Sequence, residues 1–103
     1  MAFYRRACRV DEVVDGRAVA VEVEVEGLQL AIYREGDRIV ALSGRCPHAN
    51  GPMGLGWIEE GEAVCPLHRW RFRLTTGRCT TVRGESLHRF AAEVRDGEVW
   101  VCV

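Results

Sequence analysis

Residues 46–48 (Cys-Pro-His) and 65–68 (Cys-Pro-Leu-His) decide how the rest of this sequence is interpreted. Sixteen residues separate the two stretches, so the pattern is C-x-H-x16-C-x2-H. Each stretch offers one thiolate and one imidazole, ligands that suit zinc, copper or iron–sulfur chemistry. Two Cys/His pairs of this spacing, each beside a proline, rarely arise without a metal. The candidate ligands are Cys46, His48, Cys65 and His68.

The order of these ligands distinguishes between kinds of metal site. Zinc motifs usually bring like ligands together, as a C-x2–4-C knuckle followed by an H-x3–5-H pair. Here each stretch contributes one ligand of each kind. A two-iron cluster fits that division, because each loop can give its cysteine to one iron and its histidine to the other. The pattern therefore favours a [2Fe–2S] cluster, with a structural zinc site as the alternative.

The sequence on either side of this pattern is typical of β-structure. Valine and glutamate alternate with period two over residues 18–26, and a further alternating run follows Gly27 at 28–33. Asp96-Gly97, between two apolar runs, is a strong hairpin signal. No window of 11 or more residues has helical periodicity. We expect an all-β fold whose outer strands are 18–26, 28–33, 38–42, 90–94 and 98–103.

Residues 44 to 77 differ from these outer runs in composition. The segment is rich in glycine and holds all three prolines of the chain. It predicts a subdomain of two loops and a few short strands, too small to bury much core by itself. A metal centre would supply the missing order. The length of 103 residues predicts a single domain over 1–103, with this subdomain set on a β-sheet base.

Composition and charge exclude several classes of partner. The formal net charge of −1 indicates neither nucleic acid nor an anionic membrane surface. No apolar run is long enough for a signal peptide or a membrane span. We therefore expect a cytoplasmic protein, where five cysteines suggest metal binding rather than disulfides.

The stretches at 46–51 and 65–72 resemble the cluster-binding loops of the Rieske family. The resemblance implies an antiparallel β-sandwich or barrel base domain with a small cluster-binding subdomain of two loops. It also implies one [2Fe–2S] cluster per chain, with Cys46 and Cys65 on one iron and His48 and His68 on the other. One departure is visible, because the residue after the second histidine is usually glycine and here is Arg69.

The neighbours of the ligands sort the chain within that family. High-potential members carry an extra cysteine in each loop and hydroxyl groups that donate to the cluster sulfurs. The matching positions here hold Gly51 and Leu67 in place of the cysteines, and Trp70 and Phe72 in place of the hydroxyls. Fewer donors stabilise the reduced cluster less, so we expect a low potential. The sequence thus resembles the soluble ferredoxins of bacterial ring-hydroxylating dioxygenases.

The family's oxygenases continue into a catalytic domain with a second iron site of two histidines and a carboxylate. Only His88 follows the second stretch, so we expect an electron carrier rather than an enzyme. The resemblance implies a monomer that takes electrons from a flavin-dependent reductase and passes them to an oxygenase or another redox enzyme. A small subunit of NAD(P)H-dependent nitrite reductase is the alternative, and a zinc-stabilised binding module is a weaker one.

Other residues near the pattern have open roles. Trp57, Trp70 and Phe72 shield the cluster or fill the subdomain core. We further hypothesise that positive charge surrounds the docking face, next to an apolar ring of Pro52, Met53 and Leu67. The basic residues concerned are Arg45, Arg69 and Arg71. Structural or surface positions are expected for the remaining candidates Cys8, Cys79, Cys102 and His88.

Overall fold

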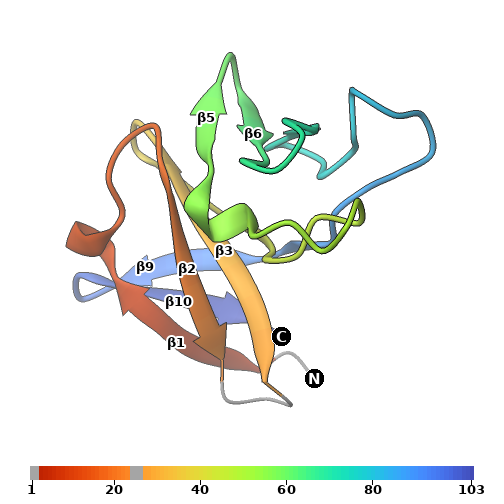
Figure 1. The fold of residues 1–103 in the computed structure, drawn as a ribbon. Helices are drawn as coiled ribbons and strands as arrows, with labels where there is room; N and C mark the ends of the chain where they lie inside the picture. The colour runs from red at the N-terminus through yellow and green to blue at the C-terminus, as the bar shows by residue number, and fades with distance from the viewer. Residues whose placement is uncertain (1–2, 24–26) are drawn as a thin grey trace.

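The computed structural model describes residues 3–23 and 27–103 and contains short strands, two 3₁₀ turns and, within those residues, no α-helix (Figure 1). The elements in chain order are β1 (Tyr4–Arg9), η1 (Val10–Glu12), β2 (Ala18–Val23), β3 (Leu28–Glu35), β4 (Arg38–Ser43), η2 (Met53–Leu55), β5 (Trp57–Glu59), β6 (Glu62–Val64), β7 (Arg71–Arg73), β8 (Arg89–Phe90), β9 (Ala92–Arg95) and β10 (Glu98–Cys102).

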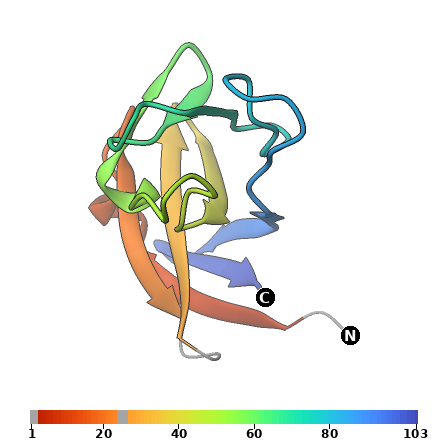
Figure 2. The ribbon, with the colours of Figure 1, turned by 45° about the vertical axis from the view of Figure 1, so that its right-hand side comes forward.

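The strands form three sheets whose strand pairs are all antiparallel. Two sheets make the base, in the orders β1-β10-β9 and β2-β3-β4-β8. The third, β5-β6-β7, is small, and its β5–β6 hairpin stands at the end of the molecule away from both termini (Figures 1 and 2). The all-β, antiparallel fold expected from the sequence is confirmed.

The central strands β3 and β4 are buried on both faces. Leu30 and Ile32 pack into a core between the two base sheets, which also contains Val99 and Val101. The intervening Ala31 and Tyr33 pack into a second core, which the base shares with the small sheet and its loops. The half-buried alternation expected over 28–33 is therefore wrong from residue 30 onward. A strand covered on both faces is apolar at consecutive positions.

Turn chemistry accounts for the hairpins. Asp96 and Gly97 have φ values of 50° and 77° and join β9 to β10. Two consecutive positive φ values define a type I′ turn, whose twist matches that of paired strands. The hairpin predicted at Asp96-Gly97 is thus confirmed. The hairpin predicted near Gly27 is confirmed by the pairing of Val23 with Leu28, while 24–26 of the predicted first strand lie outside the described residues.

One predicted strand is wrong, because the chain changes sheet within it. The segment 90–94 was expected to be continuous, but β8 ends at Phe90 and β9 begins at Ala92. β8 pairs with β4 in one base sheet, whereas β9 pairs with β10 in the other. Apolar residues on both sides of this switch make the two strands look like one in the sequence.

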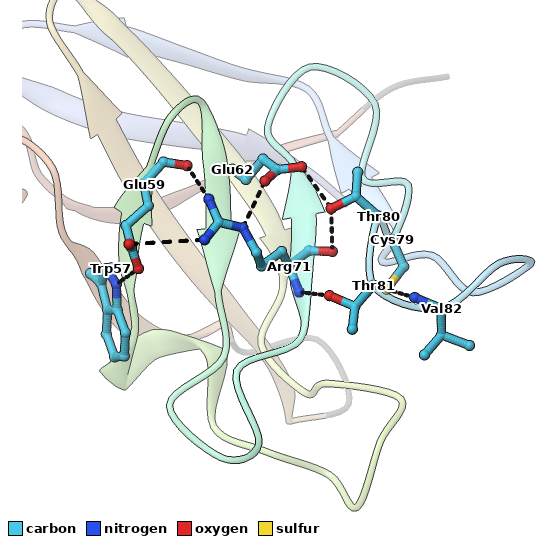
Figure 3. Close-up of polar contacts among 8 residues, drawn as sticks. All are labelled: Trp57, Glu59, Glu62, Arg71, Cys79, Thr80, Thr81 and Val82. Atoms are coloured by element: carbon cyan, nitrogen blue, oxygen red, sulfur yellow. Dashed lines mark hydrogen bonds and ion pairs between the residues drawn. The ribbon is translucent and has the colours of Figure 1, made fainter.

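A polar cluster ties the small sheet to the segment that follows Cys79 (Figure 3). The Arg71 guanidinium donates to Glu62 Oε1 at 2.7 Å and to the Glu59 carbonyl at 3.0 Å. The Thr80 hydroxyl donates to the other oxygen of Glu62 at 2.6 Å. These bonds, first that of Thr80 and then that of Arg71, lower the pKa of Glu62. Glu62 and Arg71 together therefore join three strands and a loop.

We expect the Glu62–Thr80 bond to contribute about 1 kcal/mol to the free energy of unfolding at pH 7. The pKa of Glu62 is lower in the folded protein than in the unfolded protein. The contribution of the bond is therefore fully present above the unfolded-state pKa and is lost as pH falls through the folded-state pKa. Denaturant unfolding of Glu62→Gln, Thr80→Val and the double variant should show that coupling energy. Glu62→Gln with Thr75→Val, an exposed threonine outside the cluster, should be additive. An additive Glu62/Thr80 pair would contradict the expectation.

Candidate metal centre

The two loops that carry the candidate ligands close in the same way. The Cys46 N–H donates to the Gly51 carbonyl at 2.8 Å, and the Cys65 N–H donates to the Trp70 carbonyl at 2.9 Å. In each loop the third and fourth residues after the cysteine are left-handed. Their φ values are 57° and 54° at Ala49 and Asn50, and 68° and 56° at His68 and Arg69. Both loops therefore share one backbone shape.

This common shape explains the unequal spacing of the two Cys/His pairs. His48 precedes the left-handed pair of its loop, whereas His68 is the first member of the pair in the second loop. The cysteines occupy equivalent positions, so the histidines differ by one residue. Left-handed backbone costs a residue with a side chain about 1 kcal/mol. The loops therefore carry a strain that the sequence pattern does not reveal.

The structure brings the four candidate ligands together as two like pairs. Cys46 and Cys65 are fully buried in the core shared with the base. The rings of His48 and His68 lie edge to face with centroids 4.6 Å apart. His68 is exposed and His48 is half-buried. The thiols thus face inward and the imidazoles outward.

Glycine at position 51 lets the first loop lie directly against the two thiols. A Cβ atom built on Gly51 would lie 2.5 Å from Cys65 Sγ and 3.4 Å from Cys46 Cβ. Two thiols and two imidazoles are the donor set of a Rieske-type [2Fe–2S] centre. Within residues 3–23 and 27–103, no three His, Cys, Asp or Glu side chains converge on one point. The arrangement in pairs suits two metal atoms.

Burial controls the protonation of the Cys46 thiol. It raises the pKa of the Cys46 thiol to about 11; the His48 backbone N–H lowers this pKa and the neighbouring Cys65 raises it. A thiol with such a pKa is protonated at neutral pH. Metal ligation requires the thiolate, so cluster insertion releases protons and is favoured by higher pH.

The sequence left the roles of three aromatic residues open, and the structure gives each of them a different environment. The Trp70 indole stacks on His48, with centroids 4.6 Å apart and planes 17° apart. Phe72 is fully buried in the core that contains both candidate thiols. Trp57 donates its indole N–H to Glu59 at 2.6 Å, in the cluster of Figure 3. Trp70 shields an imidazole, Phe72 is core, and Trp57 braces the hairpin.

Tyr33 is a neighbour of the site that the sequence reasoning missed. It belongs to β3, is fully buried and shares the core of Cys46 and Cys65. Burial, and then the charges of the two thiols, raise the pKa of its hydroxyl. The hydroxyl donates to the Met53 carbonyl at 3.4 Å. No local motif marks this residue, because only the packing of β3 under the loops brings it there.

The remaining cysteines and His88 lie outside the two candidate ligand pairs. Cys8 and Cys79 are buried, Cys102 is half-buried, and all five thiols are free. His88 is exposed, with its ring against Phe90 at a centroid distance of 4.5 Å. None of these residues belongs to the pair formed by His48 and His68.

Comparison with known proteins decides the family. Residues 4–91 match the family model described as the Rieske [2Fe-2S] domain. The chain belongs to the Rieske family. This Rieske protein carries a Rieske-type [2Fe–2S] cluster, as its loops indicate.

Its relatives include ferredoxin subunits. The 3-phenylpropionate/cinnamic acid dioxygenase ferredoxin subunit of Photorhabdus laumondii is 31% identical over 98 residues, covering 93% of this chain and 90% of the relative. The same subunit of Escherichia coli (strain K12) is 29% identical over 97 residues, covering 92% and 89%. These relatives are electron-carrier subunits of dioxygenase systems and not catalytic enzymes themselves.

Solved structures agree with the fold. The ferredoxin of carbazole 1,9a-dioxygenase from Nocardioides aromaticivorans IC177 superposes with a TM-score of 0.84 at 29% identity, covering 95% of each chain. A Mycobacterium tuberculosis protein described as an NADH-dependent nitrite reductase small subunit has a TM-score of 0.90 at 24% identity, covering 100% of this chain and 96% of its own. In the described part of the chain, no helix is long and apolar enough to cross a membrane.

We expect Gly51→Ala to lower the cluster content, because the added Cβ would lie 2.5 Å from Cys65 Sγ and the Cys65 side chain would have to shift. Gly51 does not have a positive φ, so backbone strain contributes nothing to this effect. Iron and sulfide content of the purified variant is the measurement. Gly84→Ala is the matched control: its Cβ meets open space, its φ of +89° makes it strained, and its cluster content should be normal. A Gly51→Ala protein with full iron and sulfide would refute the expectation.

Proposed function

We propose that Cys46 and Cys65 hold one iron of the cluster, and that His48 and His68 hold the other. The observation that carries this assignment is the buried thiol pair beneath a solvent-facing imidazole pair. Each pair combines one residue from each loop, which is the division that a Rieske centre requires.

The cluster supplies one-electron chemistry, and the chain supplies its environment. The core around Cys46 and Cys65 excludes water from the thiol side. The exposed edge of His68 gives the shortest route between the site and a partner at the surface. Trp70 holds the plane of His48 and covers one of its faces. The protein thus orients two imidazoles toward solvent while it keeps the thiols dry.

The partners we propose are a flavin-dependent reductase as electron donor and an oxygenase or another redox enzyme as acceptor. Support comes from the relatives, which are ferredoxin subunits of dioxygenases. A solved complex of reduced oxygenase and oxidized ferredoxin in carbazole 1,9a-dioxygenase contains a chain 28% identical to this one, with a TM-score of 0.84 and coverage of 96% and 92%. That complex is a precedent for an oxygenase as acceptor.

A role as the small subunit of a nitrite reductase is the second candidate. The match with a TM-score of 0.90 favours it, but 24% identity supports the fold alone. The ferredoxin role has relatives of 29–31% identity over nearly the whole chain. We therefore place the ferredoxin role first.

We also propose that residues 1–103 act as one cytoplasmic, monomeric domain whose cluster-binding part is about 44–77. The support is a core shared between the loops and the base, together with five free cysteines, which suit a reducing compartment. Size-exclusion chromatography with light scattering tests the monomer, since a dimer would double the mass.

The protein as isolated should be red-brown and contain two irons and two sulfides per chain. Cys46→Ser, His48→Ala, Cys65→Ser and His68→Ala should each lose most of the visible absorption, because each removes a ligand. Cys79→Ser and His88→Ala are matched controls outside the two pairs and should keep the colour. Colourless protein with one zinc and no sulfide would overturn the proposed function.

The reduction potential should lie near the lower end of the range of about −150 to +300 mV known for Rieske centres. Trp70 and Phe72 have no hydroxyl to donate to a sulfur, and the buried hydroxyl of Tyr33 is bonded to the Met53 carbonyl. Protein-film voltammetry of the holoprotein measures the potential. A midpoint in the upper half of the range would show that the chain supplies donors this interpretation lacks.

A further inference from the structure

Arg69 is an exposed residue in a backbone conformation that favours glycine. Its φ is 56°, and it directly follows His68, whose φ is 68°. In the part of the chain that the structure describes, its guanidinium forms no ion pair and no side-chain hydrogen bond. Strain that no contact within the molecule offsets points to a role outside it.

Arg45 lies beside the tip of the other loop. It is exposed, and its Nη1 donates to the Asn50 carbonyl at 3.5 Å. Asn50 belongs to the left-handed turn that follows His48, whose ring is 4.6 Å from that of His68. Arg45 and Arg69 therefore flank the imidazole pair, one from each loop.

Arg71, the third basic residue of the sequence hypothesis, does not belong to this group. Its guanidinium is bonded to Glu62 and to the Glu59 carbonyl (Figure 3). Its charge is balanced by Glu62 at 2.7 Å. We call the surface formed by the rings of His48 and His68 the imidazole tip. The positive charge beside it thus comes from Arg45 and Arg69.

The chain around the tip contains no opposing charge. The two loop segments, residues 44–58 and 63–70, include Arg45 and Arg69 and neither aspartate nor glutamate. The chain as a whole has a formal net charge of −1. The local charge at the loops therefore has the opposite sign to the total. Leu67, 40% exposed in the second loop, adds an apolar contact beside His68.

We propose that Arg45 and Arg69 make the imidazole tip a cationic docking surface for an electron acceptor whose own docking face carries carboxylates. The proposal rests on the proposed function, because it assumes that electrons leave at the imidazoles. One electron passes from the reduced cluster to the acceptor; no covalent bond forms or breaks. Complementary charge steers such encounters and fixes their orientation.

The test uses the reduced holoprotein and two inorganic acceptors of opposite charge, hexacyanoferrate(III) and hexaammineruthenium(III). Each takes one electron and becomes the corresponding divalent metal complex. The rate with the anion should fall as ionic strength rises, and the rate with the cation should increase, because salt screens both interactions. A response governed by the net charge of −1 would have the opposite signs and would overturn the proposal.

Variants assign the effect to Arg69. At low ionic strength Arg69→Gln should slow the reaction with hexacyanoferrate(III) about tenfold. The variant removes one positive charge from the protein surface, and a triply charged anion that approaches this charge to ~8 Å loses the attraction. Arg69→Lys keeps the charge and should retain the rate. Arg38→Gln changes the net charge equally but lies at the far end of β4, and it should have little effect. Equal rates for Arg69→Gln and Arg38→Gln would overturn the proposal.

A deca-glutamate peptide imitates the carboxylate face of the acceptor. It should slow hexacyanoferrate(III) reduction by the unaltered protein and have much less effect on Arg45→Gln/Arg69→Gln. Equal inhibition of both proteins would contradict a carboxylate-binding tip. Failure of the proposed function has a different signature, since a protein without cluster is colourless and reduces neither acceptor, and the proposal would fall with it.

Discussion

The burial of two thiols face to face constrains the rest of this structure. Cys46 and Cys65 come from different loops and lie in one fully buried core. Gly51 lies directly against them, and a Cβ at this position would be 2.5 Å from the sulfur of Cys65. Burial raises the pKa of the Cys46 thiol to about 11, so this thiol is protonated at neutral pH. If the four residues hold it as proposed, the cluster is a covalent link between two loops that have little core of their own.

The base provides the rigid surface on which these loops lie. β3 and β4 are buried on both faces, so one side of each strand packs into the base and the other beneath the thiols. Tyr33 connects these layers from a fully buried position. On the outer side, the bonds among Arg71, Glu62 and Thr80 hold the small sheet to the following segment (Figure 3). Packing below and polar contacts at the side together restrict movement of the second loop.

Charge is distributed unevenly between the β5–β6 hairpin and the two loops. Carboxylates gather on the β5–β6 hairpin, where Glu62 neutralises Arg71. The two loops keep Arg45 and Arg69 without carboxylates in their own sequence. An almost neutral protein therefore has a tip whose field differs from that of the whole molecule. Such a local field affects which surfaces meet and how often, more than how tightly they bind.

Local chemistry determined what the sequence could predict by itself. The ligand set depends on residue types and spacing, and the turn at Asp96-Gly97 depends on two neighbouring φ angles. Both are visible in short stretches. The metal chemistry and the all-β class were therefore predictable from the sequence, whereas the roles of the four ligands remain a proposal.

Only the tertiary structure decided the features that depend on distant contacts. β1 pairs with β10 from the other end of the chain, and the strand expected at 90–94 divides between two sheets. Tyr33 reaches the thiols because β3 passes beneath both loops. Arg71 is neutralised by a carboxylate nine positions earlier, while Arg69 is left exposed beside His68. Contact across a fold arises from the packing of whole sheets, so no local pattern records it.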